Sequence, residues 1–217
     1  MRNRFDEQLM LLNRKMIEMG ALCERVISLA SVALLEGDAK KAEEVMPFGH
    51  QIDQMEREIE SICLKLLLHQ QPVAGDLRQI SAALKMITDM ERIGDQAEDI
   101  AEIITFLNGR IGEECEDIRL MAEATMKMLS ESVDAYVRKD VSLAEAVKAY
   151  DDVVDDCFTR VKNTLIQMIS ENTADGEYAV DLLMIAKYFE RIGDHAVNIA
   201  EWVEFSVTGA HKGEKNL

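Results

Sequence analysis

Apolar residues near the N-terminus follow one another in alternating steps of four and three positions. The run comprises Phe5, Leu9, Leu12, Met16, Met19, Cys23, Val26, Ala30 and Ala33. This spacing is that of the a and d positions of a long helix that packs nearly parallel to its neighbours. Gly37 is expected to end the helix, and Asp38 to cap the next helix at its N-terminus. The pattern therefore predicts one long helix before residue 37.

Two further amphipathic segments follow. The second helix is predicted after Asp38, with Pro47 as a bend or first-turn residue. Its apolar positions are Ile52, Met55, Ile59, Ile62 and Leu66. A turn is predicted over 70–76, which contains Pro72 and Gly75. The third helix is predicted from about Asp76 to Leu107, with an apolar side formed by Leu77, Ile80, Leu84, Ile87, Ile104 and Leu107.

The same pattern then starts again. A shift of 102 residues places Asp140 on Asp38 and Asp155 on Asp53, and in the third helices a shift of 99 makes 91–95 recur unchanged as 190–194. These matches indicate an internal duplication of about a hundred residues. Short loops between helices imply antiparallel neighbours. The sequence predicts an all-α fold of six helices, a tandem duplication of an antiparallel three-helix bundle over residues 1–108 and 109–217.

Composition and charge narrow the class of partner. The 217 residues carry 41 acidic against 24 basic side chains, a formal net charge of −17. This excess disfavours nucleic acid and bare anionic membranes as partners, because both require clustered Lys and Arg. No apolar run approaches the ~18 residues that span a bilayer, and Asp6 and Glu7 stand where a secretory signal needs apolar residues. We expect a cytoplasmic protein without a membrane span.

The four cysteines lie at least forty residues apart along the chain, at positions 23, 63, 115 and 157. No CxxC pair or zinc-type spacing exists among them. Each has apolar neighbours at helical spacing, so we expect buried free thiols in a reducing compartment.

Acidic residues form rows at corresponding places in the two repeats. Glu91 and Asp95 are four residues apart and therefore share a helix face, as do Glu190 and Asp194. Like charges at this spacing destabilise a helix by a few tenths of a kcal/mol, so their repetition suggests that a cation collects them. If the second and third helices of each repeat face each other, the candidate metal ligands are Asp53, Glu56, Glu91, Asp95 and Glu98 in the first repeat and Asp151, Asp152, Asp155, Glu190, Asp194 and Asn198 in the second. Such oxygen ligands suit Mg²⁺, Mn²⁺, Ca²⁺ or iron.

Two alternatives stand beside metal binding. The acidic rows could be solvated faces that Arg92 or Arg191 partly neutralises. Against this, Gly94 and Gly193 recur inside the predicted helices, where glycine costs about 1 kcal/mol relative to alanine, which suggests that another group approaches closely there.

A di-iron oxidase needs Glu-x-x-His on two helices, and the chain contains none. His195 follows Asp194 and points to another face, so we expect a surface or hydrogen-bonded histidine.

Several motifs together resemble a known family. They are the segments 71–74, 76–78 and 89–95 in the first repeat, 190–202 in the second, and 207–209 near the C-terminus. These segments are similar to the two signatures of the PhoU proteins, which are bacterial and archaeal regulators associated with phosphate transport. The resemblance covers nearly the whole chain.

The resemblance implies a regulator and not an enzyme. It implies a cytoplasmic, often dimeric pair of three-helix bundles that connects the phosphate ABC transporter ATPase to a phosphate-sensing histidine kinase and holds the phosphate-starvation response off. It also implies multinuclear metal clusters of iron or zinc on Glu/Asp-x-x-x-Asp motifs, which Glu91 with Asp95, Glu190 with Asp194, and Asp151 with Asp155 match.

This chain departs from a symmetric pair of sites. Gly49 stands at the position of Asp151, so that Asp53 and Glu56 are expected to carry more of the first site. Val197 and Asn198 stand at the positions of Glu98 and Asp99, so the two sites are expected to differ in charge. A carboxylate-cluster metalloenzyme and a purely structural helical scaffold stay open as alternatives. Direct binding of phosphate also stays open, with Arg78, Arg92 and Arg191 as candidate groups.

Overall fold

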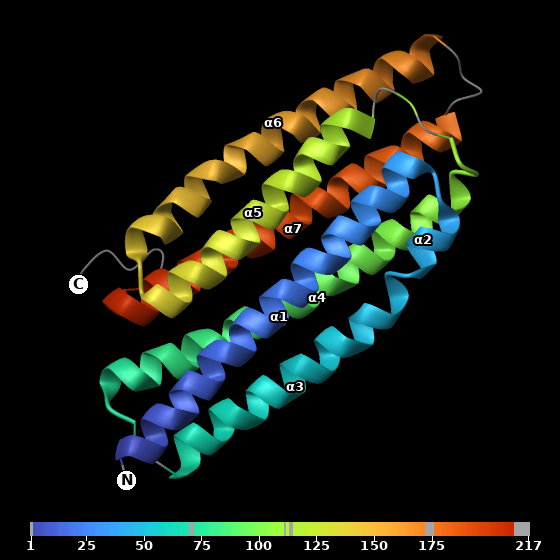
Figure 1. Ribbon diagram of the computed structural model, residues 1–217. Helices are drawn as coiled ribbons and strands as arrows, with labels where there is room; N and C mark the ends of the chain where they lie inside the picture. The colour runs from blue at the N-terminus through green and yellow to red at the C-terminus, as the bar shows by residue number, and fades with distance from the viewer. Residues whose placement is uncertain (1, 70–71, 111, 113–114, 172–175, 211–217) are drawn as a thin grey trace.

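Helices are the only regular secondary structure in the residues that the computed structural model describes, which are 2–69, 72–110, 112, 115–171 and 176–210 (Figure 1). The long helices are α1 (Arg2–Glu36), α3 (Met46–His69), α4 (Ala74–Phe106), α5 (Cys115–Arg138), α6 (Val141–Glu171) and α7 (Gly176–Thr208), and α2 (Ala39–Glu43) is a short helix between α1 and α3. The predicted all-α class is confirmed. No helix in these ranges is long and apolar enough to cross a membrane.

The helices form two three-helix bundles side by side. Helices α1, α3 and α4 make the first, and α5, α6 and α7 make the second. The bundles meet mainly along α4 and α7, which run antiparallel, while α3 and α6 lie on opposite outer sides (Figure 1). The acidic rows on α4 and α7 can therefore face α3 and α6. The predicted boundary between residues 108 and 109 falls in the connection from α4 to α5, and it stays a prediction.

The predicted apolar seams form the core. Of the positions named for α1, all are buried except Leu9, which packs partly buried against the others. The prediction for Leu77 is wrong, because its side chain is 45% exposed. The first turn of α4 is mostly exposed, whereas one turn later Ile80 is fully buried. The four cysteines are buried, and none of them forms a disulfide, as expected.

The turn chemistry confirms the predicted start of the second helix, and Pro47 stands in the first turn of α3, which is one of the two places predicted for it. Gly37 has a φ of 61°, and the Asp38 side chain accepts a hydrogen bond from the Lys40 backbone N–H at 2.9 Å. The second repeat has the same device, with Asp140 accepting from the Leu143 N–H at 3.1 Å. The helix after Asp38 is interrupted at residues 44–45, because Pro47 lacks an N–H and its ring clashes with the carbonyl four residues earlier. The predicted turn over 70–76 includes residues 70 and 71, which lie outside the described residues.

Candidate metal centres

The repeated glycines bring the two helices of each acidic row close together. A Cβ atom on Gly94 of α4 would lie 2.9 Å from Ile52 Cδ1 of α3, and one on Gly193 of α7 would lie 3.1 Å from Asp151 Oδ1 of α6. Real Cβ contacts are very rarely this short, so the absence of a side chain allows the approach. The expected close approach at these glycines is confirmed, and it places α3 against α4 and α6 against α7 beside the acidic rows.

The first candidate centre lies between α3 and α4. Oxygens from Asp53, Glu91 and Asp95 all lie within 4.8 Å of one another. Burial raises the pKa of Glu91 and of Asp95, and the other carboxylates add to both shifts. Glu56 lies nearby, where burial also raises its pKa and Thr88 Oγ1 donates to its Oε1 at 3.5 Å. Three carboxylates at this separation repel one another unless a cation neutralises them.

Glu98 lies beside the first centre in a space that Gly49 leaves open. A Cβ atom on Gly49 would lie 1.9 Å from Glu98 Oε1, so the carboxylate occupies the place of a side chain at position 49. Burial raises the pKa of Glu98, and the charge of Asp95 raises it further. In the sequence, Gly49 stands out only because the equivalent residue of the second repeat is an aspartate. In the structure, the missing side chain of Gly49 leaves the space that the Glu98 carboxylate occupies.

The second candidate centre lies between α6 and α7. Burial, followed by the charges of Asp155, Asp194 and Glu190, raises the pKa of Asp151 to about 6. Burial and the charge of Glu190 also raise the pKa of Asp194. Asp152 and Asp155 are exposed on α6. The predicted acidic residues of this repeat are therefore close enough to influence one another.

Lys187 distinguishes the second centre from the first. Its Nζ donates to both carboxylate oxygens of Glu190, at 2.6 and 2.5 Å. Lys187 precedes Glu190 by three residues, a spacing at which helical side chains meet, so the sequence contained the signal. The expected neutralisation by Arg92 or Arg191 is not the contact observed for this carboxylate.

The two repeats differ in which helix carries one of the carboxylates near the candidate centre. In the first repeat Glu98 on α4 fills the space above Gly49 on α3. In the second repeat the residue equivalent to Gly49 is Asp151 on α6, and the residue equivalent to Glu98 is Val197 on α7. At this pair of equivalent positions, the carboxylate therefore stands on the third helix of the first repeat and on the second helix of the second repeat. Among the described residues, only Asp53, Glu91 and Asp95 bring carboxylate oxygens within 4.8 Å of one another. Glu98 lies close enough for the charges of Asp95 and Asp53 to raise its pKa, and the charges of Asp155, Asp194 and Glu190 raise that of Asp151 in the same way, without a convergence of three oxygens at the second centre in the described part of the chain.

Asn198 is turned away from the second centre toward α4. Its Nδ2 donates to Asp89 Oδ1 at 3.2 Å, and His195 Nδ1 makes a hydrogen bond to the same oxygen at 2.9 Å. Asp89 is only 6% exposed and was not among the predicted site residues. The expectation of a hydrogen-bonded His195 is confirmed. Finding Asp89 required the register between α4 and α7, which the sequence does not contain.

We expect Asp151→Asn to stabilise the metal-free protein at pH 8. The folded-state pKa of Asp151 lies above its ordinary value, so folding opposes its ionisation, and stability is lost as the pH rises from about 4 to about 6. Removing that charge should raise the free energy of unfolding by about 1 kcal/mol, less than the full shift implies because the carboxyl is partly solvated. The gain should vanish near pH 4, where the carboxyl is protonated in both states.

Urea unfolding in the presence of a chelator measures the free energy of unfolding of wild type and Asp151→Asn at pH 8 and at pH 4. The control is Asp152→Asn on the exposed side of the same turn, for which we expect a change within about 0.5 kcal/mol. A loss of stability in Asp151→Asn that is equal at pH 4 and pH 8 would contradict the explanation.

Comparison with known proteins agrees with this architecture. The PhoU domain matches the chain twice, over residues 16–104 and 118–203. A phosphate-specific transport system accessory protein PhoU homolog from Clostridium acetobutylicum is 36% identical over 207 residues, which are 94% of this chain and 94% of that protein. The corresponding homolog from Pseudomonas aeruginosa is 34% identical, over 94% of this chain and 86% of that one.

Solved structures show the same fold. The crystal structure of PhoU from Pseudomonas aeruginosa superposes with a TM-score of 0.89 and 34% identity, and covers 95% of this chain and 100% of that chain. The phosphate transport system regulatory protein PhoU from Streptococcus pneumoniae gives a TM-score of 0.86 at 26% identity, over 95% and 98% of the two chains. With both repeats matched and relatives aligned over nearly their full lengths, the chain belongs to the PhoU family.

Proposed function

We propose that the protein is a cytoplasmic, non-enzymatic negative regulator of phosphate uptake and phosphate-starvation signalling, whose two carboxylate clusters bind metal. Its relatives are named as accessory or regulatory proteins of phosphate transport, which supports a role beside the transporter. The regulatory direction and the partners, the phosphate ABC transporter ATPase and a phosphate-sensing histidine kinase, come from the family resemblance.

The observation that carries the metal proposal is the convergence of Asp53, Glu91 and Asp95 within 4.8 Å between α3 and α4. Glu98 supplies a fourth carboxylate there, and Asp151, Asp155, Glu190 and Asp194 offer four at the second centre. The donors are all carboxylate oxygens, which suit iron, Mn²⁺, Mg²⁺ or Ca²⁺ and which also occur as ligands of zinc. Iron or zinc in multinuclear clusters is the family expectation.

Bound cations would affect the packing of the helices directly and the binding of partners only indirectly. Metal at the first centre would link α3 to α4 and metal at the second would link α6 to α7. Each would remove the repulsion between carboxylates that adds to the effect of burial on their pKa values. The outer helices α3 and α6 would then be held in defined positions. The remaining acidic surface could steer encounters with basic patches on the ATPase or kinase, which affects association rate more than affinity.

Deleting the gene from its host tests the regulatory role. We expect phosphate-responsive transcription to stay on, and phosphate uptake to stay high, when phosphate is plentiful. Complementation by the wild-type chain should restore repression, and a variant that lacks both Glu91 and Glu190 should not. Unchanged transcription and uptake after deletion would contradict the proposal.

A pulldown with the purified ATPase and kinase tests the partners. We expect the wild-type chain to retain both in the presence of metal and less of each after chelation. Sedimentation of the same preparation reports whether the chain forms the homodimer that the family resemblance implies. Failure to retain either partner under both conditions would rule out the adaptor role.

A further inference from the structure

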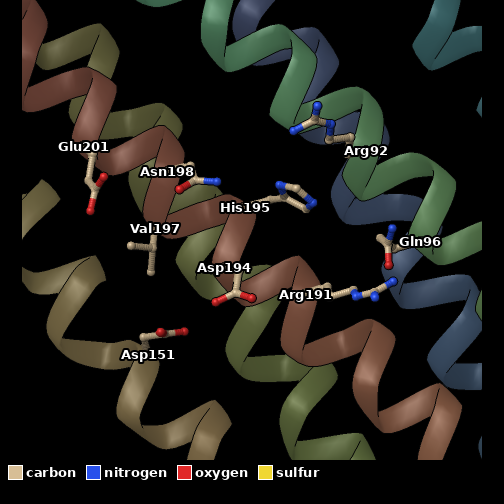
Figure 2. A pocket seen from close by; sticks show the side chains of 9 residues that line it. All are labelled: Arg92, Gln96, Asp151, Arg191, Asp194, His195, Val197, Asn198 and Glu201. Atoms are coloured by element: carbon tan, nitrogen blue, oxygen red, sulfur yellow. The ribbon is translucent and has the colours of Figure 1, made fainter.

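We propose that a cavity beside the seam of α4 and α7 binds a phosphoryl oxyanion through Arg92, Arg191 and His195. The cavity has a volume of about 710 Å³, and its lining includes these three residues and Gln96. Figure 2 shows Arg92, Gln96, Arg191 and His195 on the side of α7 that faces α4, with Asp151 and Asp194 toward α6. The cavity thus has a nitrogen-rich side and an acidic side.

The duplication explains why two arginines reach one cavity. Arg92 and Arg191 occupy equivalent positions in the repeats, and α4 and α7 run antiparallel. The contact of Asp89 with Asn198 is mirrored by that of its equivalent, Tyr188, with Asp99. An approximate twofold axis therefore passes between α4 and α7, and it brings both guanidinium groups to the same surface.

Arg92 and Arg191 are both exposed, and neither makes an ion pair in the described residues. The charge of Arg92 acts on Glu91, and the Arg191 guanidinium lies 5.8 Å from the centroid of the Tyr188 ring. In the described part of the chain, no carboxylate lies within 4.0 Å of the guanidinium nitrogens of Arg92 or Arg191, although acidic residues greatly outnumber basic ones. Two like-charged guanidinium groups that line one cavity repel each other, and a bound dianion would reverse the sign of that interaction. Guanidinium groups also match the geometry of phosphate oxygens through paired N–H donors.

The remaining polar groups are positioned for a ligand. Asp89 holds the His195 ring through Nδ1, which leaves Nε2 as the other ring nitrogen available to the cavity. The Gln96 side chain lines the same cavity, and its buried Oε1 has no hydrogen-bond partner in the described residues. This oxygen is an acceptor, so it would pair with the O–H of a hydrogen phosphate dianion and not with its charged oxygens.

The acidic side of the cavity makes anion binding depend on the second metal centre. Asp151 and Asp194 repel an anion while they are ionised and free of metal, and a divalent cation on them would remove that repulsion. This step rests on the proposed function. Because linkage is reciprocal, phosphate should then tighten metal binding by the same factor.

Titration calorimetry of the full chain with inorganic phosphate tests the inference. We expect binding by the metal-loaded wild type and a loss of about tenfold or more in affinity for Arg92→Gln/Arg191→Gln, because hydrogen bonds to charged groups are among the strongest in proteins. The matched control is Arg14→Gln/Arg138→Gln, which removes two exposed arginines outside the cavity and should bind phosphate as the wild type does.

The other measurements separate the possible sources of a positive result. Adenosine monophosphate in place of phosphate distinguishes a free oxyanion from a phosphate ester, and tighter binding of either one identifies the source. Phosphate that binds only to the metal would bind the double variant unchanged, and that result would overturn the inference, as would no binding by the wild type.

Metal content measured on the same samples separates failure of the proposed function from failure of the anion site. If no metal binds, an arginine-dependent phosphate affinity in metal-free protein still supports the cavity. Equal phosphate affinity with and without bound metal would overturn the linkage between the two sites.

Discussion

Glu91→Ala is expected to remove metal from the first centre and leave the second loaded, and Glu190→Ala is expected to do the reverse. Glu91 is one of the three residues whose oxygens converge within 4.8 Å, so its loss breaks the cluster directly. Loss of an outer-shell partner alone weakens metal sites by about 10–100-fold, so we expect more than about 100-fold for this ligand. Elemental analysis after dialysis against a metal buffer measures the remaining metal in each single variant and in the double variant.

The two variants should differ in size of effect. Glu190 is already held by Lys187, which competes with a cation for its oxygens, so Glu190→Ala should cost less affinity than Glu91→Ala. Glu102→Ala is the control, because Glu102 is an exposed carboxylate farther along the same row of α4. Unchanged metal content in both variants would contradict metal binding by these clusters and would favour the solvated-scaffold alternative.

Stability provides a second measurement that separates metal loss from unfolding. Burial and neighbouring carboxylates raise the pKa of Glu91, so its ionised form opposes folding when no metal is present. Metal-free Glu91→Ala should therefore be no less stable than metal-free wild type at pH 8. A loss of metal accompanied by unfolding in chelator would attribute the loss to misfolding and not to the missing ligand.

The fold could be predicted almost completely because its determinants are local and repeated. The four-and-three spacing from Phe5 to Ala33 indicates which side of a single helix is buried. The recurrence of 91–95 at 190–194 indicates the duplication. The sequence leaves open whether Pro47 bends the second helix or stands in the first turn of a new one, because its missing N–H allows both and the neighbouring helices decide. The structure shows the second case, with α3 beginning at Met46.

Only those features of the candidate sites that depend on the spacing of residues within one helix could be predicted from the sequence. Glu91 and Asp95 share a face of α4 in any packing, so helical spacing alone identifies them. The roles of Gly49, Asp89 and Asn198 depend on which residues of a second helix lie opposite, and that register is set by core packing. This is why Asn198 was assigned to the acidic cluster, whereas its amide contacts Asp89 across α4 and α7.

Gly49→Ala is expected to weaken metal binding at the first centre with little loss of stability. The added methyl group would lie 1.9 Å from Glu98 Oε1, which is the end of a flexible side chain that can rotate away. The carboxylate would then leave the cluster, and we expect a loss of about 10-fold or more in affinity at this centre, as for other disrupted metal-site partners. The free energy of unfolding should change by less than about 1 kcal/mol, since alanine is also the better helix former.

The double variant Gly49→Asp/Glu98→Val should recover the metal that Gly49→Ala loses. It gives the first repeat the pair found in the second, where Asp151 stands opposite Val197, so the carboxylate returns to the cluster from α3 and not from α4. Glu98→Val alone removes the carboxylate, so this variant should bind metal as weakly as Gly49→Ala. Gly49→Asp alone displaces the Glu98 carboxylate but supplies another in its place, so its metal affinity should lie near that of the wild type. Metal affinities of the wild type, Gly49→Asp, Glu98→Val and the double variant form a double-mutant cycle, and the two positions should be strongly coupled because they supply one ligand between them. Additive losses at 49 and 98 would show that the two carboxylates are independent and that the repeats are not built on an exchanged ligand.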